Sequence, residues 1–263
     1  MKNIMLTLKV ELYKLVCQRY SVILVFGFIL FLVALGWVRL KVAGYSDIQI
    51  SGFQLAAFIV STGSNLLTLI MIFLSGALVS SERSQGNLDL VCVRSVLRSQ
   101  LISGKLLHLF SVALMLMILL FAMGLLSGAA LIGLESMMEN GYVIYSFSEL
   151  LRHYAMGFCF AAPPVFAWCS IALFFSILIE SSLWANASSL VLFFAFYLLL
   201  PFNEIVGFTP NQFLNASMEM MGRITCGLPS NWGSINVAPL SSTIYVLIFS
   251  FLSILLFRKK DIR

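Results

Sequence analysis

The stretch SSERSQGNLDLVCVRSVLRSQLISGK occupies residues 80–105 and separates two long apolar runs of the chain. Ser80 and Ser81 are residue types that cap the start of a helix, and Glu82 suits the positive end of a helix dipole. Gly86 permits a bend, after which leucines and valines supply an apolar side. The stretch therefore predicts a short amphipathic helix on the inner surface of a membrane, between two membrane-spanning segments.

The composition places the rest of the chain in a bilayer. Of its 263 residues, 60% are hydrophobic and only 10% are charged, a balance typical of membrane proteins. Six apolar runs approach or exceed the roughly 20 residues that cross a hydrocarbon core. They cover residues 21–38, 53–79, 106–134, 154–179, 183–200 and 237–257. Because no internal repeat or low-complexity linker divides them, the sequence predicts one all-α membrane domain, residues 1–263, with six transmembrane helices.

The distribution of basic residues predicts the orientation of the chain. Twelve of the 16 Lys and Arg residues fall before residue 21, within residues 80–105 or after residue 257, whereas four fall in connections on the opposite side. The positive-inside rule then places both termini in the cytoplasm. Residues 1–20 carry an apolar stripe at helical spacing and predict an amphipathic interfacial helix on the inner leaflet. A disordered basic tail is the alternative.

The longest outer connection covers residues 202–236. Thr209-Pro210 is a favourable helix start, because threonine can cap a helix and proline is tolerated in its first turn. The residues that follow form a weak apolar side of Phe213, Leu214, Ser217, Met218 and Met221. The pattern predicts a short outer helix that dips against the membrane.

The six predicted spans lack Asp, Glu, Lys and Arg, and this excludes several functions. Transporters that run on ion gradients need an ionisable group within the membrane, so uphill transport needs an energy source in another subunit. His108 and His153 fall at opposite membrane faces and cannot share one site. Gly104-Lys105 lacks the first glycine and the following Ser or Thr of a phosphate loop. We therefore expect no catalytic, metal or nucleotide site in this chain.

Two polar or irregular features inside the spans are candidates for a transport path or an interface. Ser61, Asn65 and Thr68 fall on one face of the second apolar run and either line a path or meet a partner subunit. Ordinary hydrogen bonding between helices is the alternative. Pro163 and Pro164 remove backbone donors in the fourth run, and they predict a break or kink that acts as a hinge or as a static bend.

The third apolar run contains Gly124 and Gly128, a spacing that permits the close approach of two helix backbones. The second helix belongs either to the same chain or to another subunit. Because the pattern is common by chance, packing within the chain is the simpler interpretation.

The order of charged residues and glycines in residues 80–105 resembles that of a known family. An acidic residue, a glycine, a basic residue and a Gly-Lys pair follow one another at set intervals, at Glu82, Gly86, Arg98, Gly104 and Lys105. This arrangement resembles the loop between the second and third spans of type-2 ABC-transporter permeases. Asn87 and Ser95 depart from the family pattern, which has a threonine and a proline at those two places.

The resemblance implies partners as well as a fold. In that family the loop rests on a separate ATPase subunit, which binds ATP and Mg²⁺, while the permease itself holds no cofactor. The implied ATPase-coupling residues here are Glu82, Gly86, Arg98 and Lys105. The resemblance also implies two ATPase subunits, a second permease copy or a paralogue, and surrounding membrane lipids in a bacterial inner membrane. Nothing in the sequence indicates binding of nucleic acid.

The implied function is ATP-driven export through a membrane permease. Cargo classes of the family include drugs, antimicrobial peptides and lipids, and apolar spans with scattered hydroxyl groups suit a hydrophobic cargo. The alternative is a non-transporting immunity or scaffold protein that binds a peptide at its outer loops. An ATPase gene beside this one would favour export.

Overall fold

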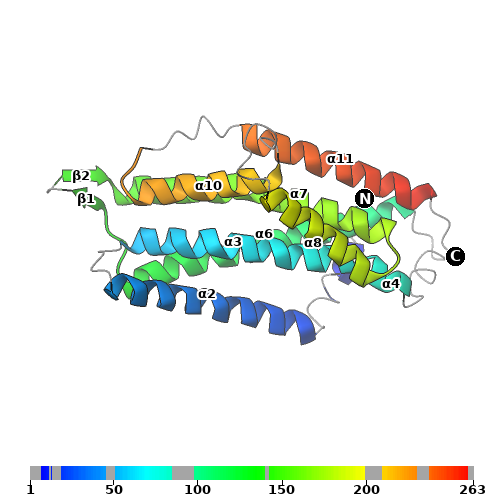
Figure 1. Cartoon of the computed structure of the whole chain (residues 1–263), viewed down its shortest axis with the longest axis horizontal. Coiled ribbons are helices and arrows are strands. Elements are labelled where there is room, and N and C mark those ends of the chain that lie inside the picture. The colour runs from blue at the N-terminus through cyan, green and yellow to red at the C-terminus, as the bar shows by residue number, and fades with distance from the viewer. Residues whose placement is uncertain are drawn as a thin grey trace.

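The computed structural model describes residues 7–11, 13, 19–45, 51–84, 98–139, 142–198, 209–229 and 237–259. Its elements are α2 (Arg19–Tyr45), α3 (Gly52–Ala77), α4 (Ser80–Ser84), α6 (Arg98–Leu131), β1 (Met137–Glu139), β2 (Tyr142–Tyr145), α7 (Phe147–Leu178), α8 (Ser182–Leu198), α10 (Pro210–Thr225) and α11 (Val237–Lys259). Residues 7–11 are also helical. The long helices run side by side as an elongated bundle, with the β1–β2 hairpin at one end and α4 at the other (Figure 1).

Four helical stretches of the described residues are long and apolar enough to cross a membrane. They are Gly52–Ser84, Arg98–Leu131, Phe147–Leu178 and Pro239–Lys259. α2 is a 27-residue helix over the first predicted run, and α8 is a shorter apolar helix over the fifth. The chain is therefore an all-α membrane protein apart from its short hairpin, as predicted, and the number of six crossings stays a prediction.

Helix α7 begins at Phe147, seven residues before the start of its predicted apolar run at Tyr154. Ser146 and Glu149 form a capping box at this end. The backbone N–H of Glu149 donates to Ser146 Oγ at 3.3 Å, and the N–H of Ser146 donates to Glu149 Oε2 at 2.8 Å. Hydropathy locates the apolar part of such a helix but not its capped polar end.

Helix α6 also begins earlier than its apolar run, at Arg98 rather than Leu106. Its 34 residues extend roughly 50 Å, well beyond the thickness of a hydrocarbon core. The extra turns at its start carry Lys105, which the sequence placed in a loop, onto a continuous helix. Because Lys105 lies on this helix, its side chain is buried in the bundle.

The two strands form an antiparallel hairpin in which Met137 lies opposite Tyr145 and Glu139 lies opposite Tyr142. The hairpin was not predicted. The run of β-branched and aromatic residues at 142–145 follows an Asn-Gly dipeptide in the sequence, and this combination favours a tight hairpin. That signal could have located it.

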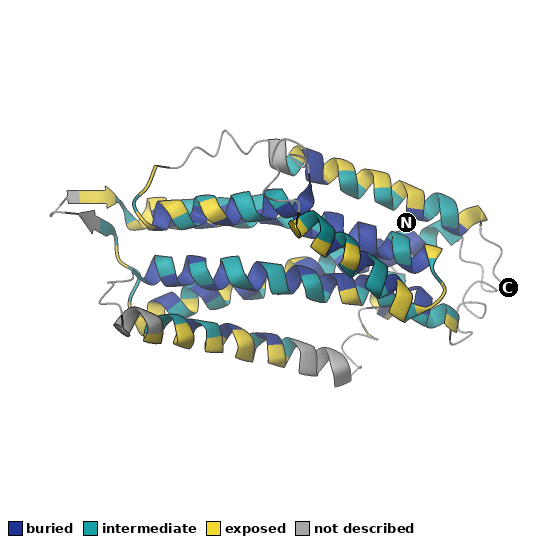
Figure 2. Ribbon diagram, viewed as in Figure 1, coloured by how far each residue is buried: buried dark blue, intermediate teal, exposed yellow. Residues whose placement is uncertain are grey.

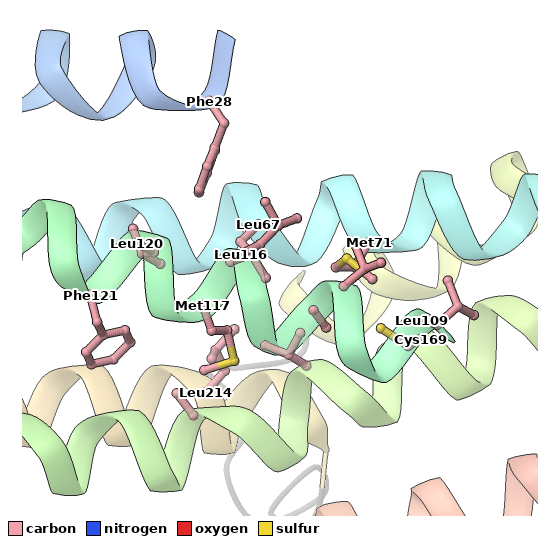
Figure 3. Packing of buried hydrophobic residues seen from close by; sticks show 14 of the residues in the cluster. Phe28, Leu67, Met71, Leu109, Leu116, Met117, Leu120, Phe121, Cys169 and Leu214 are labelled. Atoms are coloured by element: carbon pink, nitrogen blue, oxygen red, sulfur yellow. The ribbon is translucent and has the colours of Figure 1, made fainter. Parts of the chain in front are cut away.

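The interior of the bundle is built by α3, α6 and α7. Figure 3 shows part of their apolar cluster, which includes Leu67, Met71, Leu116, Met117, Phe121 and Cys169, and to which α10 adds Leu214. Buried residues line the inner sides of these helices, and exposed residues gather on the outer sides of α2 and α11 (Figure 2). In the most apolar window of α7, 61% of the residues are buried, against 22% in α11, so α7 is central and α11 peripheral.

Helix α10 begins where predicted, at Thr209-Pro210, and the five residues of its predicted apolar side are all buried. The predicted cap by the threonine is wrong, because the Thr209 side chain makes no cap hydrogen bond. The helix also lies along α7 and α3, within the bundle, instead of resting on the outer ends of the spans (Figure 1).

The contacts of α10 show that it runs antiparallel to α7. Asn211, at its start, bonds Trp168 near the middle of α7, whereas Met221, towards its end, lies against Gly157. Asn211 Nδ2 also donates to the Phe193 carbonyl of α8 at 3.0 Å. α10 therefore starts at mid-depth in the bundle, beside both α7 and α8.

An Asn211→Leu variant should lose about 1–3 kcal/mol of unfolding free energy. Trp168 Nε1 donates to Asn211 Oδ1 at 2.6 Å, and the fully buried indole would be left without an acceptor. Thermal unfolding of the purified protein in detergent measures the loss. Asn215→Leu, on a half-buried position of the same helix, is the matched control, and equal midpoints for the two variants would contradict the prediction.

Candidate functional site

Among the described residues, three charged side chains form a buried network at the end of the bundle that carries α4 (Figure 1). Lys105 of α6 is completely buried, and its Nζ lies 2.8 Å from Glu82 Oε2 of α4 and 3.0 Å from Glu11 Oε1 of the N-terminal segment. The Glu11 side chain is 7% exposed and the Glu82 side chain 18%. A third contact joins Nζ to the Leu78 carbonyl at 3.5 Å. Three segments far apart in the sequence therefore meet at one ammonium group.

The geometry explains how such a charge is tolerated away from water. A lysine ammonium has three N–H donors, and the two carboxylates and the carbonyl supply three acceptors. Removing an ion from water costs several kcal/mol, and only close, hydrogen-bonded partners offset that cost. With all three groups ionised, the network carries one positive and two negative charges. Lys105 therefore holds together two carboxylates that would otherwise repel each other.

A second set of contacts joins α4 to the C-terminal end of α7. The hydroxyl oxygen of Ser176 accepts hydrogen bonds from the backbone N–H groups of Val79 and Ser80, both at 3.0 Å. Arg83 Nη1 donates to the Ile177 carbonyl at 3.4 Å. α4 is thus joined to α7 through Ser176 and to α6 through Lys105.

The start of α4 is capped by a serine, but not by Ser80 as predicted. The Ser80 hydroxyl donates backward to the Gly76 carbonyl at 2.8 Å, and the acceptor for the first N–H groups comes from Ser176 on another helix. A serine 96 residues away does the capping, so no local sequence pattern could indicate it.

Two of the four predicted coupling residues are brought together by the fold. Glu82 and Lys105 form the ion pair described above, whereas Arg98 is the half-buried first residue of α6, and Gly86 lies outside the described residues. Sequence reasoning missed Glu11. It is the only acidic residue in residues 1–20 and lies at helical spacing within their apolar stripe, which was the available signal.

The predicted polar face of α3 bonds to its own backbone. The Thr68 hydroxyl donates to the Ser64 carbonyl at 2.8 Å, and Asn65 Nδ2 lies 3.5 Å from the Ser61 carbonyl. In the described part of the chain, Thr68 and Asn65 thus bond within their own helix, and no hydrogen bond from them to another helix of this chain is present. A role for Ser61, Asn65 and Thr68 in a path or a partner interface stays a prediction.

The proline pair does not interrupt its helix. α7 runs continuously from Phe147 to Leu178 through Pro163 and Pro164, so the predicted break is absent, and a hinge at this point stays a prediction. The Gly124 and Gly128 pair packs against α3 of the same chain. A side chain at Gly128 would meet the backbone carbonyl of Gly52, which confirms packing within the chain.

Comparison with known proteins gives a match to a family of membrane transporters. The model of the family described as ABC-2 family transporter protein matches residues 7–195. The match includes all three residues of the buried network and ends within α8. No curated protein matches the chain.

Proposed function

Because this chain belongs to the family of ABC-2 transporter proteins, and is therefore the membrane permease subunit of an ABC transporter, we propose that it exports a hydrophobic cargo with energy from a separate ATPase. The ATPase subunits, two per transporter, bind ATP and Mg²⁺. The chain has no catalytic activity of its own and pairs with a second permease copy or a paralogue. Peptides, drugs and lipids are the cargo classes that its apolar helices suit.

The buried pair of Glu82 and Lys105 is the observation that carries this proposal. It links α4, at the predicted ATPase-facing end, directly to the long helix α6. Ser176 links the same short helix to α7. A force applied to α4 therefore reaches two membrane helices through contacts shorter than 3.1 Å, without a flexible connection. Networks of hydrogen bonds and ion pairs are among the structures that carry energetic coupling between distant sites, which supports this role for α4.

The proposed topology has six crossings and both termini in the cytoplasm of a bacterial cell. α8 has 17 residues and is about 26 Å long, somewhat less than the hydrocarbon core. α10 continues from the level of Phe193 towards the hairpin end of the bundle, so we include it with α8 in the fifth crossing. The N-terminal helix lies on the inner leaflet beside α4.

Charge reversal in the coupling segment should uncouple the transporter. When the chain is co-purified with the ATPase encoded beside it and placed in lipid nanodiscs, the rate of ATP hydrolysis is expected to differ from that of the ATPase alone. In a variant with both Glu82→Lys and Arg98→Glu, this effect should fall at least about fivefold, the lower end of usual coupling energies. The same loss should appear in ATP-driven cargo release.

Arg152→Glu is the matched control, because this exposed residue lies near the opposite end of the bundle, at the start of α7. It should leave the change in ATP hydrolysis intact. Failure to form a complex with the ATPase, or full coupling in the doubly reversed variant, would contradict the proposal. Protection of cells against a peptide that survives inactivation of the ATPase would favour the immunity or scaffold function instead.

A further inference from the structure

We propose that Glu11 is a positioning residue that fastens the N-terminal helix to the coupling machinery through Lys105. In consequence, ATP-driven displacement of α4 moves the N-terminal helix together with α6. This inference rests on the proposed function and adds to it a third moving element and the residue that attaches it. Glu11 acts through Lys105 and needs no contact with nucleotide or cargo.

Glu11 is the point at which the described part of the N-terminal segment is buried against the bundle. Of its described residues, Glu11 alone is buried, at 6% exposure, whereas Val10 is 48% exposed and Tyr13 72%. A buried carboxylate among exposed neighbours is stable only when a strong partner holds it, and Lys105 Nζ lies 3.0 Å away. The described residues of this segment therefore contact the bundle through an ion pair, and that pair is made by the lysine that also holds α4.

The carboxylates of Glu82 and Glu11 connect Lys105 to different segments of the chain. Glu82 connects Lys105 to α4, which precedes the predicted ATPase contact, and Glu11 connects the same ammonium to the N-terminal helix. Neutralising Glu11 leaves one positive and one negative charge, so the link between α4 and α6 keeps a balanced pair. A Glu11→Gln variant should therefore release the N-terminal helix while preserving the path from α4 to α6.

This difference defines the experiment. In the full chain with its five native cysteines replaced by alanine, single cysteines are introduced by Ser84→Cys in α4 or Tyr13→Cys in the N-terminal segment, both at exposed positions. Each is spin-labelled, assembled with the ATPase in nanodiscs, and measured with and without ATP plus vanadate. The change of label mobility on nucleotide trapping is the readout.

With Glu11 in place, both labels should respond to ATP. In the Glu11→Gln background the response at residue 84 should be retained, and the response at residue 13 should fall below half. Lys9→Gln is the matched control, since it also removes one charge from the same segment, but from an exposed side chain. It should leave both responses unchanged. A purely structural role for Glu11 would lower both responses together.

The outcomes separate this inference from the proposed function. Equal responses at residue 13 in the Glu11→Gln and Lys9→Gln variants would overturn the inference alone. No response at residue 84 in the chain with native Glu11 would overturn the proposed function, and the inference with it. If Glu11→Gln fails to insert, hydrogen exchange of the unaltered complex decides. Nucleotide should then change amide exchange in residues 7–11 as well as 80–84, and a change confined to 80–84 would overturn the inference.

Discussion

A Lys105→Met variant is expected to lose about 3–5 kcal/mol of unfolding free energy, the usual cost of removing one partner from a buried ion pair. The completely buried ammonium lies within 3.0 Å of both Glu11 and Glu82, so its loss removes the positive charge that both buried carboxylates share. Methionine matches the length of the lysine stem, and the apolar contacts are retained. Thermal unfolding in detergent, with the folded fraction followed by helical circular dichroism, measures the change.

The same network predicts a rescue. A triple variant, Lys105→Met with Glu11→Gln and Glu82→Gln, removes these three charges together and should recover most of the lost stability, because replacing buried ion-pair partners together by neutral groups is often close to neutral. Lys9→Met is the control for loss of an exposed lysine and should change the midpoint little. A triple variant as unstable as Lys105→Met would show that packing, not charge, dominates at this position.

The positions of the helices could be predicted from the sequence because each membrane-spanning helix is a continuous run of apolar residues. Apolar runs predicted α2, α3, α6, α7, α8 and α11, and Thr209-Pro210 marked the start of α10. The ends were less accurate because polar helix termini extend past the apolar core, as Arg98 at the start of α6 shows. That difference of a few turns is what carried Lys105 from a predicted loop into the interior.

Only the part of the candidate site that lies within one stretch of sequence could be predicted. Glu82 and Lys105 were identified by their order in the chain, but Glu11, which shares the same ammonium, lies 94 residues from the lysine. The capping of α4 by Ser176 and the depth of α10 beside Trp168 are likewise contacts between distant segments. A single sequence encodes such contacts only through the whole fold, so no local pattern could show them.

Gly128 is a position where a small substitution should have a large effect on the packing between helices. A Cβ atom there would overlap the carbonyl oxygen of Gly52 and lie 3.0 Å from its carbonyl carbon. Backbone atoms cannot rotate away as a side chain does, so Gly128→Ala must separate α6 from α3. We expect a cost of about 1–3 kcal/mol or more in unfolding free energy, the range for inserting a methyl group into a packed core.

A graded series of alanine substitutions tests whether backbone contact is the cause. Gly63→Ala would meet methyl groups of Leu120 and Leu32, which can change rotamer, so its cost should be smaller. Gly27→Ala on α2 would meet no atom of the described residues within 4 Å, and helix propensity should make it neutral or up to about 1 kcal/mol stabilising. Unfolding midpoints should therefore rise in the order Gly128, Gly63, Gly27. A midpoint for Gly128→Ala equal to that for Gly27→Ala would mean that α3 and α6 do not approach this closely, because the predicted difference in stability comes from the backbone contact between Gly128 and Gly52.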